Sequence, residues 1–387
     1  MYLICITLAK LTNAFIRLFN LGNGLTWPGH VTLKLYPDLL HENVLFPKKG
    51  LIYISATNGK TTTTKLIVHI LKKSGYSVVT NDSGANLLNG IASALILNTS
   101  VRGVARADFG VFEVDEFNLP QLLEKRVPNV LMLLNLSRDQ LDRYGETDII
   151  LDKWMDAAKK LPQTVKLVLD VQQPQLTSVA AHFKGDTYYF DNTIEHLDRV
   201  ALKGDSNARN LNAALYAVSF FGIATDTALN TLHDFSAAWG RGENIFYSDI
   251  SWKLFLAKNP MSFTSNLKTT QDSFSLIDTF LFILNDNIPD GRDVSWIYDV
   301  PADLLALICA NKNIFVAGSR AFDMAVRLTY ADVPIKKENI VPDIKHAVDL
   351  VAAATKKTNV PKKEVLVFPN YSAMLALRKI IVGRSIL

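Results

Sequence analysis

The chain has 387 residues, of which 49% are hydrophobic and 20% are charged, so it has the composition of a globular protein. A single hydrophobic core stops growing at roughly 250–300 residues, and we therefore expect two domains. The net charge of +4 comes without any run of Lys and Arg interleaved with aromatic residues, which excludes the usual nucleic-acid-binding patterns. The two cysteines, Cys5 and Cys309, lie too far apart to suggest a zinc site or a disulfide framework, so a reducing compartment is expected.

The N-terminal segment, residues 1–45, is predicted to begin with an amphipathic helix. Apolar residues recur there at helical spacing: Ile4, Leu8, Leu11, Phe15 and Leu18. Lys10, Asn13 and Arg17 interrupt this stretch, so it lacks the ~18 continuous apolar residues that a membrane-spanning helix needs. We expect the apolar stripe to pack on the body of a cytoplasmic protein, and contact with a membrane surface is the alternative.

Strand-type apolar runs alternate with helical patterns along the rest of the chain. The strand candidates are 51–55, 110–114, 129–134, 166–169, 280–284, 313–317 and 364–368, and helical patterns cover 62–73, 207–221, 225–235, 302–311, 320–330, 345–355 and 371–380. Such alternation is typical of α/β domains with mostly parallel, doubly wound sheets. We place a central domain at 46–238 and a smaller α/β domain at 239–387, because a Gly-containing break begins at Trp239.

The segment between the strand at 51–55 and the helix at 62–73 is predicted to bind a nucleotide. It reads Ala56-Thr57-Asn58-Gly59-Lys60-Thr61-Thr62. Such a loop at a helix N-terminus offers backbone N–H groups and the helix dipole to phosphate oxygens. Gly59 permits close approach, Lys60 reaches the β- and γ-phosphates, and the Thr61 hydroxyl is placed for Mg²⁺. The eight-residue phosphate-loop pattern is incomplete, and the alternative is a polar turn.

Polar clusters follow other predicted strands. Glu113, Asp115 and Glu116 lie at the end of the strand at 110–114, and the segment Asn135–Gly145 follows the strand at 129–134. Open parallel sheets put ligands at the carboxyl ends of their strands, and Mg²⁺ takes carboxylate and phosphate oxygens. The acidic cluster therefore predicts a magnesium site, with a solvated turn as the alternative.

These motifs together resemble the Mur ligases and, among them, the MurT type. The resemblance rests on 56–64, Gly84–Leu87, 112–116, Asn135–Asp142, Gly204–Asn210, Gly240–Glu243, Leu256–Pro260, Asp290–Asp299, Gly318–Ala321 and Asn370–Leu375. Gln140 stands where ordinary Mur ligases carry His, and Lys258-Asn259-Pro260 stands where they carry Asp-x-x-His-x-Pro. Both differences are typical of the MurT type. They weaken the resemblance of this chain to an amino-acid-adding ligase or to a folylpolyglutamate synthase.

The resemblance implies a Mur-ligase-like central ATP-binding domain and assigns roles to its residues. The cofactor-binding residues would be Thr57, Asn58, Gly59, Lys60, Thr61, Thr62, Asn207, Asn210 and Arg241. Asn207 and Asn210 would hold the base of ATP, Lys60 and Arg241 would act on the transferring phosphate, and Thr61 with Glu113 would hold Mg²⁺. Asp115 or Glu116 would be companions of Glu113.

Two departures from the MurT type bear on cofactors. MurT-type chains carry a four-cysteine zinc ribbon, whereas no cysteine lies between Tyr188 and Gly204 here, so zinc is not expected. Ala56 replaces the usual glycine of the loop, a small change that leaves the Lys and Thr groups in place.

The reaction implied by the resemblance is ATP-dependent amidation of the α-carboxylate of D-glutamate in the lipid II stem peptide, through an acyl phosphate. Ammonia would come from a GatD-like glutamine amidotransferase, because neither cysteine has the setting of a glutaminase nucleophile. Asp299 would complete the Cys-His pair of that partner, with Asp293 as the reserve; a cap or turn is the alternative role of either. Lipid II would be met at the inner face of the membrane.

Two other functions stay open from the sequence. One is a Mur-type ligase that adds an amino acid to a peptidoglycan precursor and needs no partner. The other is a nucleotide-binding scaffold without catalysis of its own, in which substitution of Lys60 would leave function unchanged.

Overall fold

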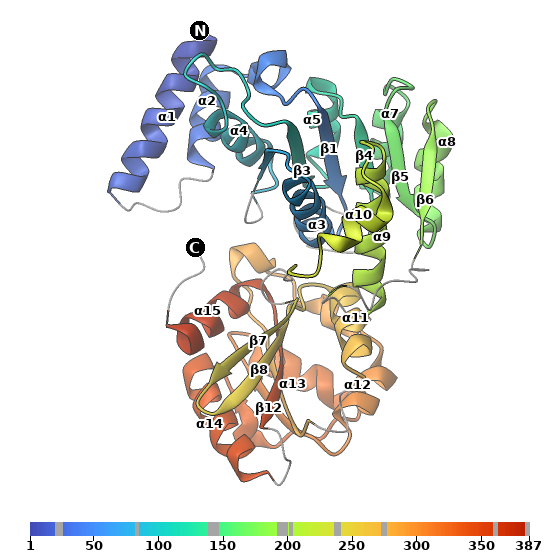
Figure 1. Cartoon of the computed structure of the whole chain (residues 1–387). Coiled ribbons are helices and arrows are strands. Elements are labelled where there is room, and N and C mark those ends of the chain that lie inside the picture. Colours follow the sequence, from blue (N-terminus) through green and yellow to red (C-terminus); the bar gives the residue numbers. More distant parts are fainter. Residues whose placement is uncertain are drawn as a thin grey trace. The chain divides into compact units, whose positions relative to one another are not determined.

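The computed structural model describes residues 1–19, 26–81, 85–137, 147–191, 200, 204–235, 241–271, 277–358 and 363–383, without the side chains of Arg17 and Arg241. The chain divides into two compact units, one with Met1–Leu136 and Thr147–Ser236 and the other with Ala237–Ile386 (Figure 1). Each unit is an α/β structure with a six-stranded sheet, which confirms the predicted fold class. The predicted boundary after residue 238 lies outside the described residues and stays a prediction.

Six parallel strands form the sheet of the first unit. They are β1 (Gly50–Ser55), β2 (Val78–Thr80), β3 (Phe109–Val114), β4 (Val130–Leu133), β5 (Lys166–Asp170) and β6 (Thr187–Phe190), in the order β2-β3-β1-β4-β5-β6. Every residue of β1 is buried, as expected for an apolar strand in the middle of a parallel sheet. Because β1 lies between β3 and β4, the loops after these three strands open at one edge.

Helices cover this sheet and one another. They are α3 (Lys60–Lys73), α4 (Leu88–Leu97), α5 (Leu119–Lys125), α7 (Thr147–Ala158), α8 (Thr177–His182), α9 (Asp205–Ser219) and α10 (Thr225–Asn230), with 3-10 turns at η1 (Leu39–His41), η2 (Asn43–Leu45) and η4 (Pro174–Leu176). α3 contacts β1, β2 and β3, and α9 contacts β4, β5, β6 and α3. α7 contacts both α5 and α8. The neighbouring α3 and α9 thus bring the sequence around residue 60 to the sequence around residue 210.

Two helices precede the sheet, α1 (Tyr2–Leu18) and α2 (Trp27–Leu35), and both contact α4 (Figure 1). The predicted N-terminal helix is confirmed, but the prediction of its packing face was wrong. Ile4, Leu11 and Leu18 are 69%, 62% and 79% exposed. The buried residues of α1 are instead Cys5, Ile6, Ala9 and Ile16.

Two polar contacts explain why α1 turns its other face to the protein. The Tyr2 hydroxyl donates to the carbonyl oxygen of Gly103, and the Lys10 ammonium donates to the carbonyl oxygen of Thr99 at 2.6 Å. These anchors, together with the small side chains of Cys5 and Ala9, fix the rotation of the helix about its axis. Helical spacing alone could not show which of two apolar faces would be covered.

The second unit has a mixed sheet. Its strands are β7 (Arg241–Tyr247), β8 (Ile250–Phe255), β9 (Thr279–Ile283), β10 (Asn313–Ala317), β11 (Ile340–Val341) and β12 (Glu364–Pro369), in the order β11-β10-β9-β12-β8-β7. Only β7 pairs antiparallel, with β8, through a turn in which Ser248 and Asp249 have φ of 53° and 63°. Those angles are typical of a two-residue hairpin turn.

Helices pack on both faces of the second sheet. They are α11 (Pro260–Thr270), α12 (Ala302–Cys309), α13 (Ala321–Thr329), α14 (Ile344–Lys357) and α15 (Tyr371–Val382), with 3-10 turns at η7 (Ile288–Asp290), η8 (Ser295–Asp299) and η9 (Lys337–Asn339). Alternate residues of β9 belong to different core clusters: Phe280 and Phe282 pack with residues of α11, α12 and α13, whereas Leu281 and Ile283 pack with α14 and α15. Among the helices described, none combines the length and the apolarity that crossing a bilayer requires.

Candidate active site

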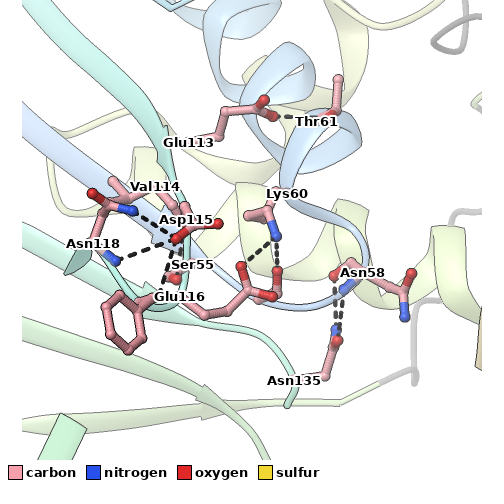
Figure 2. Close-up of polar contacts among 12 residues, drawn as sticks. Ser55, Asn58, Lys60, Thr61, Glu113, Val114, Asp115, Glu116, Asn118 and Asn135 are labelled. Carbon is pink, nitrogen blue, oxygen red and sulfur yellow. Dashed lines mark hydrogen bonds and ion pairs between the residues drawn. The ribbon is translucent and has the colours of Figure 1, made fainter. Parts of the chain in front are cut away.

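The loop after β1 lies where the order of the first sheet changes direction. β1 has β3 on one side and β4 on the other, and the chain leaves β1 through Ala56-Thr57-Asn58-Gly59 into α3. Open α/β sheets bind ligands at such a point, outside the carboxyl ends of the strands. The sequence motifs that follow β1, β3 and β4 therefore meet at one place (Figure 2).

Gly59 is required at its position for two reasons. Its φ of 91° is in the left-handed region, which other residues rarely adopt. A Cβ atom there would also lie 2.3 Å from Oδ1 of Asn210 on α9. The loop thus turns into α3 with its backbone pressed against α9, and the helix N-terminus points its N–H groups at the edge of the sheet.

Asn135, which follows β4, holds the loop in shape. Its Oδ1 accepts from the backbone N–H of Asn58 at 2.9 Å, and its Nδ2 donates to the carbonyl oxygen of Asn58 at 2.8 Å. The backbone N–H of Thr57 donates to the carbonyl oxygen of Asn135 at 3.1 Å. The sequence places Asn135 in a polar segment that follows a strand, but it does not predict this clamp, which depends on side-chain geometry between neighbouring strands.

Lys60 is the cation of the loop. It is buried, and its ammonium lies 2.9 Å from Oε2 of Glu116, whose side chain is also buried. The ammonium also donates to the carbonyl oxygen of Ala56 at the start of the loop. Lys60 is therefore held beside the loop by an internal carboxylate (Figure 2), an arrangement that the acidic cluster in the sequence did not reveal.

Thr61 and Glu113 meet as predicted for a magnesium site. The Thr61 hydroxyl donates to Oε2 of Glu113 at 2.8 Å, and Glu113 is 3% exposed at the end of β3. Asn81 fixes the backbone of Glu113 from both sides: its Oδ1 accepts from the Glu113 N–H at 3.0 Å and its Nδ2 donates to the Glu113 carbonyl at 2.7 Å. Because hydroxyl and carboxylate oxygens are the hard donors that Mg²⁺ takes beside phosphates, this pair fits the ion.

The two acidic companions have other contacts. Oδ1 of Asp115 accepts from the backbone N–H groups of Phe117 and Asn118, at 3.2 and 3.3 Å, and from Nδ2 of Asn118 at 2.8 Å, just before α5 begins. Glu116 pairs with Lys60, and its carbonyl oxygen accepts from the Trp154 indole at 2.9 Å. Glu113 is therefore the member of the cluster whose carboxylate lies nearest to a predicted magnesium ligand.

The two asparagines predicted to hold a base lie on α9. Asn210 is buried and lies so close to Gly59 that a side chain at that position would collide with it. Its Oδ1 accepts from the Thr63 hydroxyl at 3.4 Å. Asn207 is half-buried in the first turn of the helix, where its N–H donates to the carbonyl oxygen of Gly204. The structure thus brings Asn210 to the loop itself, and Asn207 lies one turn closer to the helix N-terminus.

The sequence motifs of the second unit also gather at the carboxyl edge of their sheet. Asn285 follows β9, Ser319 follows β10 and Asn370 follows β12. Asn370 Nδ2 donates to the Asn285 carbonyl at 2.7 Å, the Asn285 N–H donates to Asn370 Oδ1 at 3.2 Å, and the Ser319 N–H donates to Asn285 Oδ1 at 3.0 Å. Asp290 accepts from the Ser372 N–H at 2.9 Å and from its hydroxyl. Burial raises the pKa of the Asp290 carboxyl, although the hydrogen bonds from Ser372 oppose that shift.

Comparison with protein families accounts for both units. The Mur ligase middle domain matches residues 54–211, and the MurT ligase C-terminal domain matches residues 256–374. The chain belongs to the Mur ligase family, and its C-terminal part is of the MurT type. The resemblance found in the motifs is confirmed.

Individual relatives agree with these domains along the whole chain. The MurT subunit of lipid II isoglutaminyl synthase (glutamine-hydrolyzing) from Staphylococcus aureus strain COL is 27% identical, with 95% of each chain covered. The same subunit from Streptococcus pneumoniae strain R6 is 26% identical, again with 95% of each chain covered. The structure of MurF ligase from Thermotoga maritima in complex with ADP superposes with a TM-score of 0.66 at 14% identity, over 90% of this chain and 82% of that one, and shows the shared fold.

Three predicted residues belong to the second unit of the chain. Arg241 begins β7, but its side chain lies outside the description. Asp299 is exposed at the end of η8. Asp293 precedes η8, where hydrogen bonds from the side chain and backbone of Ser295 lower the pKa of its carboxyl, so Asp293 acts as a turn carboxylate.

Parts of three Mur ligase motifs lie outside the described residues. They are Ser83 and Gly84 of the segment before α4, 138–146 of the segment after β4, which contains Gln140, and Gly240 of the segment Gly240–Glu243. The described parts of the first two, Ala85–Asn86 and Asn135–Ser137, follow the same edge of the sheet; the Ala85 carbonyl accepts from Asn81, and the Asn86 carbonyl accepts from the Asp115 N–H.

Proposed function

We propose that the chain is the ligase subunit of a lipid II isoglutaminyl synthase, which uses ATP to amidate the α-carboxylate of D-glutamate in the stem peptide. The observation that carries the proposal is the meeting of Lys60, Thr61 and Glu113 at the switch point of a Mur ligase middle domain, in a chain whose other part is of the MurT type. Relatives with this pair of domains bear the name of that synthase.

The reaction has two steps. A carboxylate oxygen of the substrate attacks the γ-phosphorus of ATP, the bond from that phosphorus to the bridging oxygen breaks, and ADP leaves with the bonding electrons. Ammonia then attacks the carbonyl carbon of the acyl phosphate, the carbon–oxygen bond to phosphate breaks, and the nitrogen loses a proton. The amide and inorganic phosphate are the products.

The residues of the loop supply charge and position rather than covalent chemistry. Lys60 exchanges its partner Glu116 for phosphate oxygens, and N–H groups at the start of α3 bind the same oxygens, next to a loop that Asn135 holds in shape. Thr61 and Glu113 would hold Mg²⁺, which neutralises charge on the transferring phosphate. Asn207 and Asn210 would hold the base, and Arg241 would act on the transferring phosphate.

Ammonia comes from a separate subunit, a glutamine amidotransferase of the GatD type. Both cysteines of the chain are buried, and burial raises the pKa of the Cys309 thiol to about 12, which disfavours a nucleophilic thiolate. Asp299 is the candidate that orients the catalytic His of the partner. Its neighbours support a docking surface, because Tyr298 and Tyr330 are exposed with their ring centroids 6.3 Å apart.

The place of work is the inner face of the membrane, where the head group of a lipid-linked substrate is accessible from water. Peripheral attachment would keep the ligase at that substrate. This location follows from the substrate and is part of the proposal.

The test combines the chain with an amidotransferase of the GatD type, ATP, Mg²⁺ and lipid II, and follows amide formation by mass spectrometry. Lys60→Ala should abolish amidation with glutamine and with ammonium alike, and Lys72→Ala, an exposed lysine of the same helix, is the matched control. Asp299→Asn should abolish amidation with glutamine but leave amidation with ammonium.

Each of the other functions predicts a different result. A non-catalytic scaffold would keep full activity in Lys60→Ala. An amino-acid-adding ligase would incorporate an amino acid without any partner and would not use ammonium. If Asp299→Asn also lost the ammonium reaction, the role of Asp299 in the partner's site would be contradicted. The ligase assignment would be unaffected.

A further inference from the structure

The outer face of α1 is an exposed apolar surface. Its members are Leu3, Ile4, Leu8, Leu11, Phe15, Leu18 and Phe19, all exposed, and the rings of Phe15 and Phe19 lie 4.5 Å apart. The opposite face is already covered, because it packs on α2 and α4 and is anchored through Tyr2 and Lys10. So many exposed apolar side chains on one helix face mark a site of contact with another molecule or with a membrane.

The segment that carries this face has charges of one sign. Residues 1–37 contain Lys10, Arg17 and Lys34 and no Asp or Glu. Lys10 belongs to the covered side, where its ammonium donates to Thr99. The loop that receives the Tyr2 hydroxyl adds two exposed cations, Arg102 and Arg106, on either side of Gly103.

The first acidic residues of the chain, Asp38 and Glu42, follow α2. Glu42 is already engaged, because its carboxylate accepts from the Tyr36 hydroxyl at 2.5 Å. The apolar face therefore belongs to a positively charged region, formed by the helices α1 and α2 and by the loop around Gly103.

We propose that the outer face of α1 lies on an anionic lipid bilayer and attaches the protein to its surface. A helix that combines Leu, Ile and Phe on one face with basic and polar flanks lies in the plane of the interface, its apolar face among the acyl chains. With its 17 residues, α1 would lie along the surface of the bilayer. Exposed Trp27 at the start of α2 adds an aromatic ring of the type that membrane interfaces favour.

This inference deepens the proposed function, since it names the surface that would bring the ligase to a lipid-linked substrate. Charge favours a bilayer over a second copy of the chain. A second copy of the same face would bring like charges together, whereas anionic head groups neutralise them.

The experiment is flotation of the full chain with vesicles of phosphatidylglycerol and phosphatidylcholine in equal parts. The wild-type protein should float with these vesicles and much less with pure phosphatidylcholine. Leu11→Glu with Phe15→Glu should lower the partition coefficient roughly a hundredfold, because two apolar side chains leave the bilayer. The matched control is Ile288→Glu with Leu307→Glu, two exposed apolar residues of the second unit that should leave partitioning unchanged.

Several outcomes would overturn the inference. They are a wild-type protein that does not float with anionic vesicles, and an α1 double variant that floats as well as the wild type. Self-association of the wild type in sedimentation, abolished by the α1 substitutions and without vesicle binding, would assign the face to a second copy. Circular dichroism should show that both double variants fold, since all four side chains are exposed.

The result is separable from the fate of the proposed function. Flotation needs no nucleotide, and Lys60→Ala should float like the wild type while it makes no amide. Conversely, the α1 double variant should amidate a water-soluble analogue of the stem peptide at the wild-type rate and lose rate only with lipid II in vesicles.

Discussion

The two units use the same edge of the same kind of sheet in different ways. At the carboxyl edge of the first sheet the contacts are charged, with Lys60 beside Glu116 and Thr61 beside Glu113. At the carboxyl edge of the second sheet they are mostly between amides and hydroxyls, with Asn285 and Asn370 bonded to each other. Charged partners can be exchanged for a charged ligand, whereas paired amides satisfy each other and hold loops in place.

In both units the topology of the sheet creates a site at this edge, and the chemistry of the side chains there determines what the site can do. Both edges bring together loops from three neighbouring strands. A buried ammonium is costly to leave without a counter-charge, and Glu116 supplies that charge to Lys60. The bonds between Asn285 and Asn370 are between neutral amides and hold their two loops together, and the carboxylates beside them, Asp286 and Asp290, accept from Ser319 and Ser372.

The largest effect on nucleotide affinity is expected from Gly59→Ala at the first edge. The substitution forces a left-handed backbone angle on Ala and drives Asn210 away, at a cost of about 1–3 kcal/mol. Titration calorimetry should show that affinity for ATP with Mg²⁺ falls roughly ten- to hundredfold. Gly75→Ala has a similar φ of 88° but meets nothing within 4 Å, so it should leave affinity unchanged; equal losses in both variants would contradict the role of the Gly59 contact.

An effect on stability alone is expected from Gly318→Ala at the second edge. Gly318 has a φ of 98°, and a Cβ there would lie 2.3 Å from the backbone carbonyl oxygen of Leu284, which cannot move aside without disturbing β9. Denaturant unfolding should show a loss of about 2–4 kcal/mol with nucleotide affinity intact. Gly383→Ala, with a φ of 76° and open space around it, should cost only about 1 kcal/mol. A fall in ATP affinity in Gly318→Ala would contradict the proposed difference between the two edges, in which only the first binds the nucleotide.

The smallest effect is expected at the amino edge of the first sheet, where the charged side chain of Asp108 contributes to stability. Hydrogen bonds from the backbone and hydroxyl of Ser77 and from Lys49 lower the pKa of Asp108 to about 2. A lowered pKa in the folded state means stability that is present above the unfolded pKa of 3.8 and is lost as pH falls toward about 2. Asp108→Asn should therefore lower the melting temperature slightly above about pH 4, and the difference from wild type should vanish by about pH 2. A difference that persists in strong acid would contradict this origin.

Much of the fold could be predicted because buried parallel strands are continuous apolar runs. The strands predicted at 51–55 and 110–114 are confirmed as β1 and β3, and the loop between 51–55 and the following helix is confirmed as the turn into α3. β7 and β8 were not predicted as strands, because their polar residues alternate with apolar ones next to a glycine-containing break.

The rest depended on contacts that spacing does not encode. The side of α1 that packs is decided by Tyr2 and Lys10 reaching a loop 89 or more residues away. The clamp of Asn135 on Asn58 spans 77 residues. Sequence patterns identified the residue types of the site, and only the folded sheet shows which of them touch.

Both thiols of the chain are enclosed, with Cys5 and Cys309 each 2% exposed. Native labelling reagents that require an accessible thiolate should therefore leave the wild-type protein unmodified. A single cysteine introduced on the surface then becomes a unique attachment point for a fluorophore. Placed on the outer face of α1 or beside Asp299, such a reporter would register the arrival of lipid or of the second subunit without any background from the native residues.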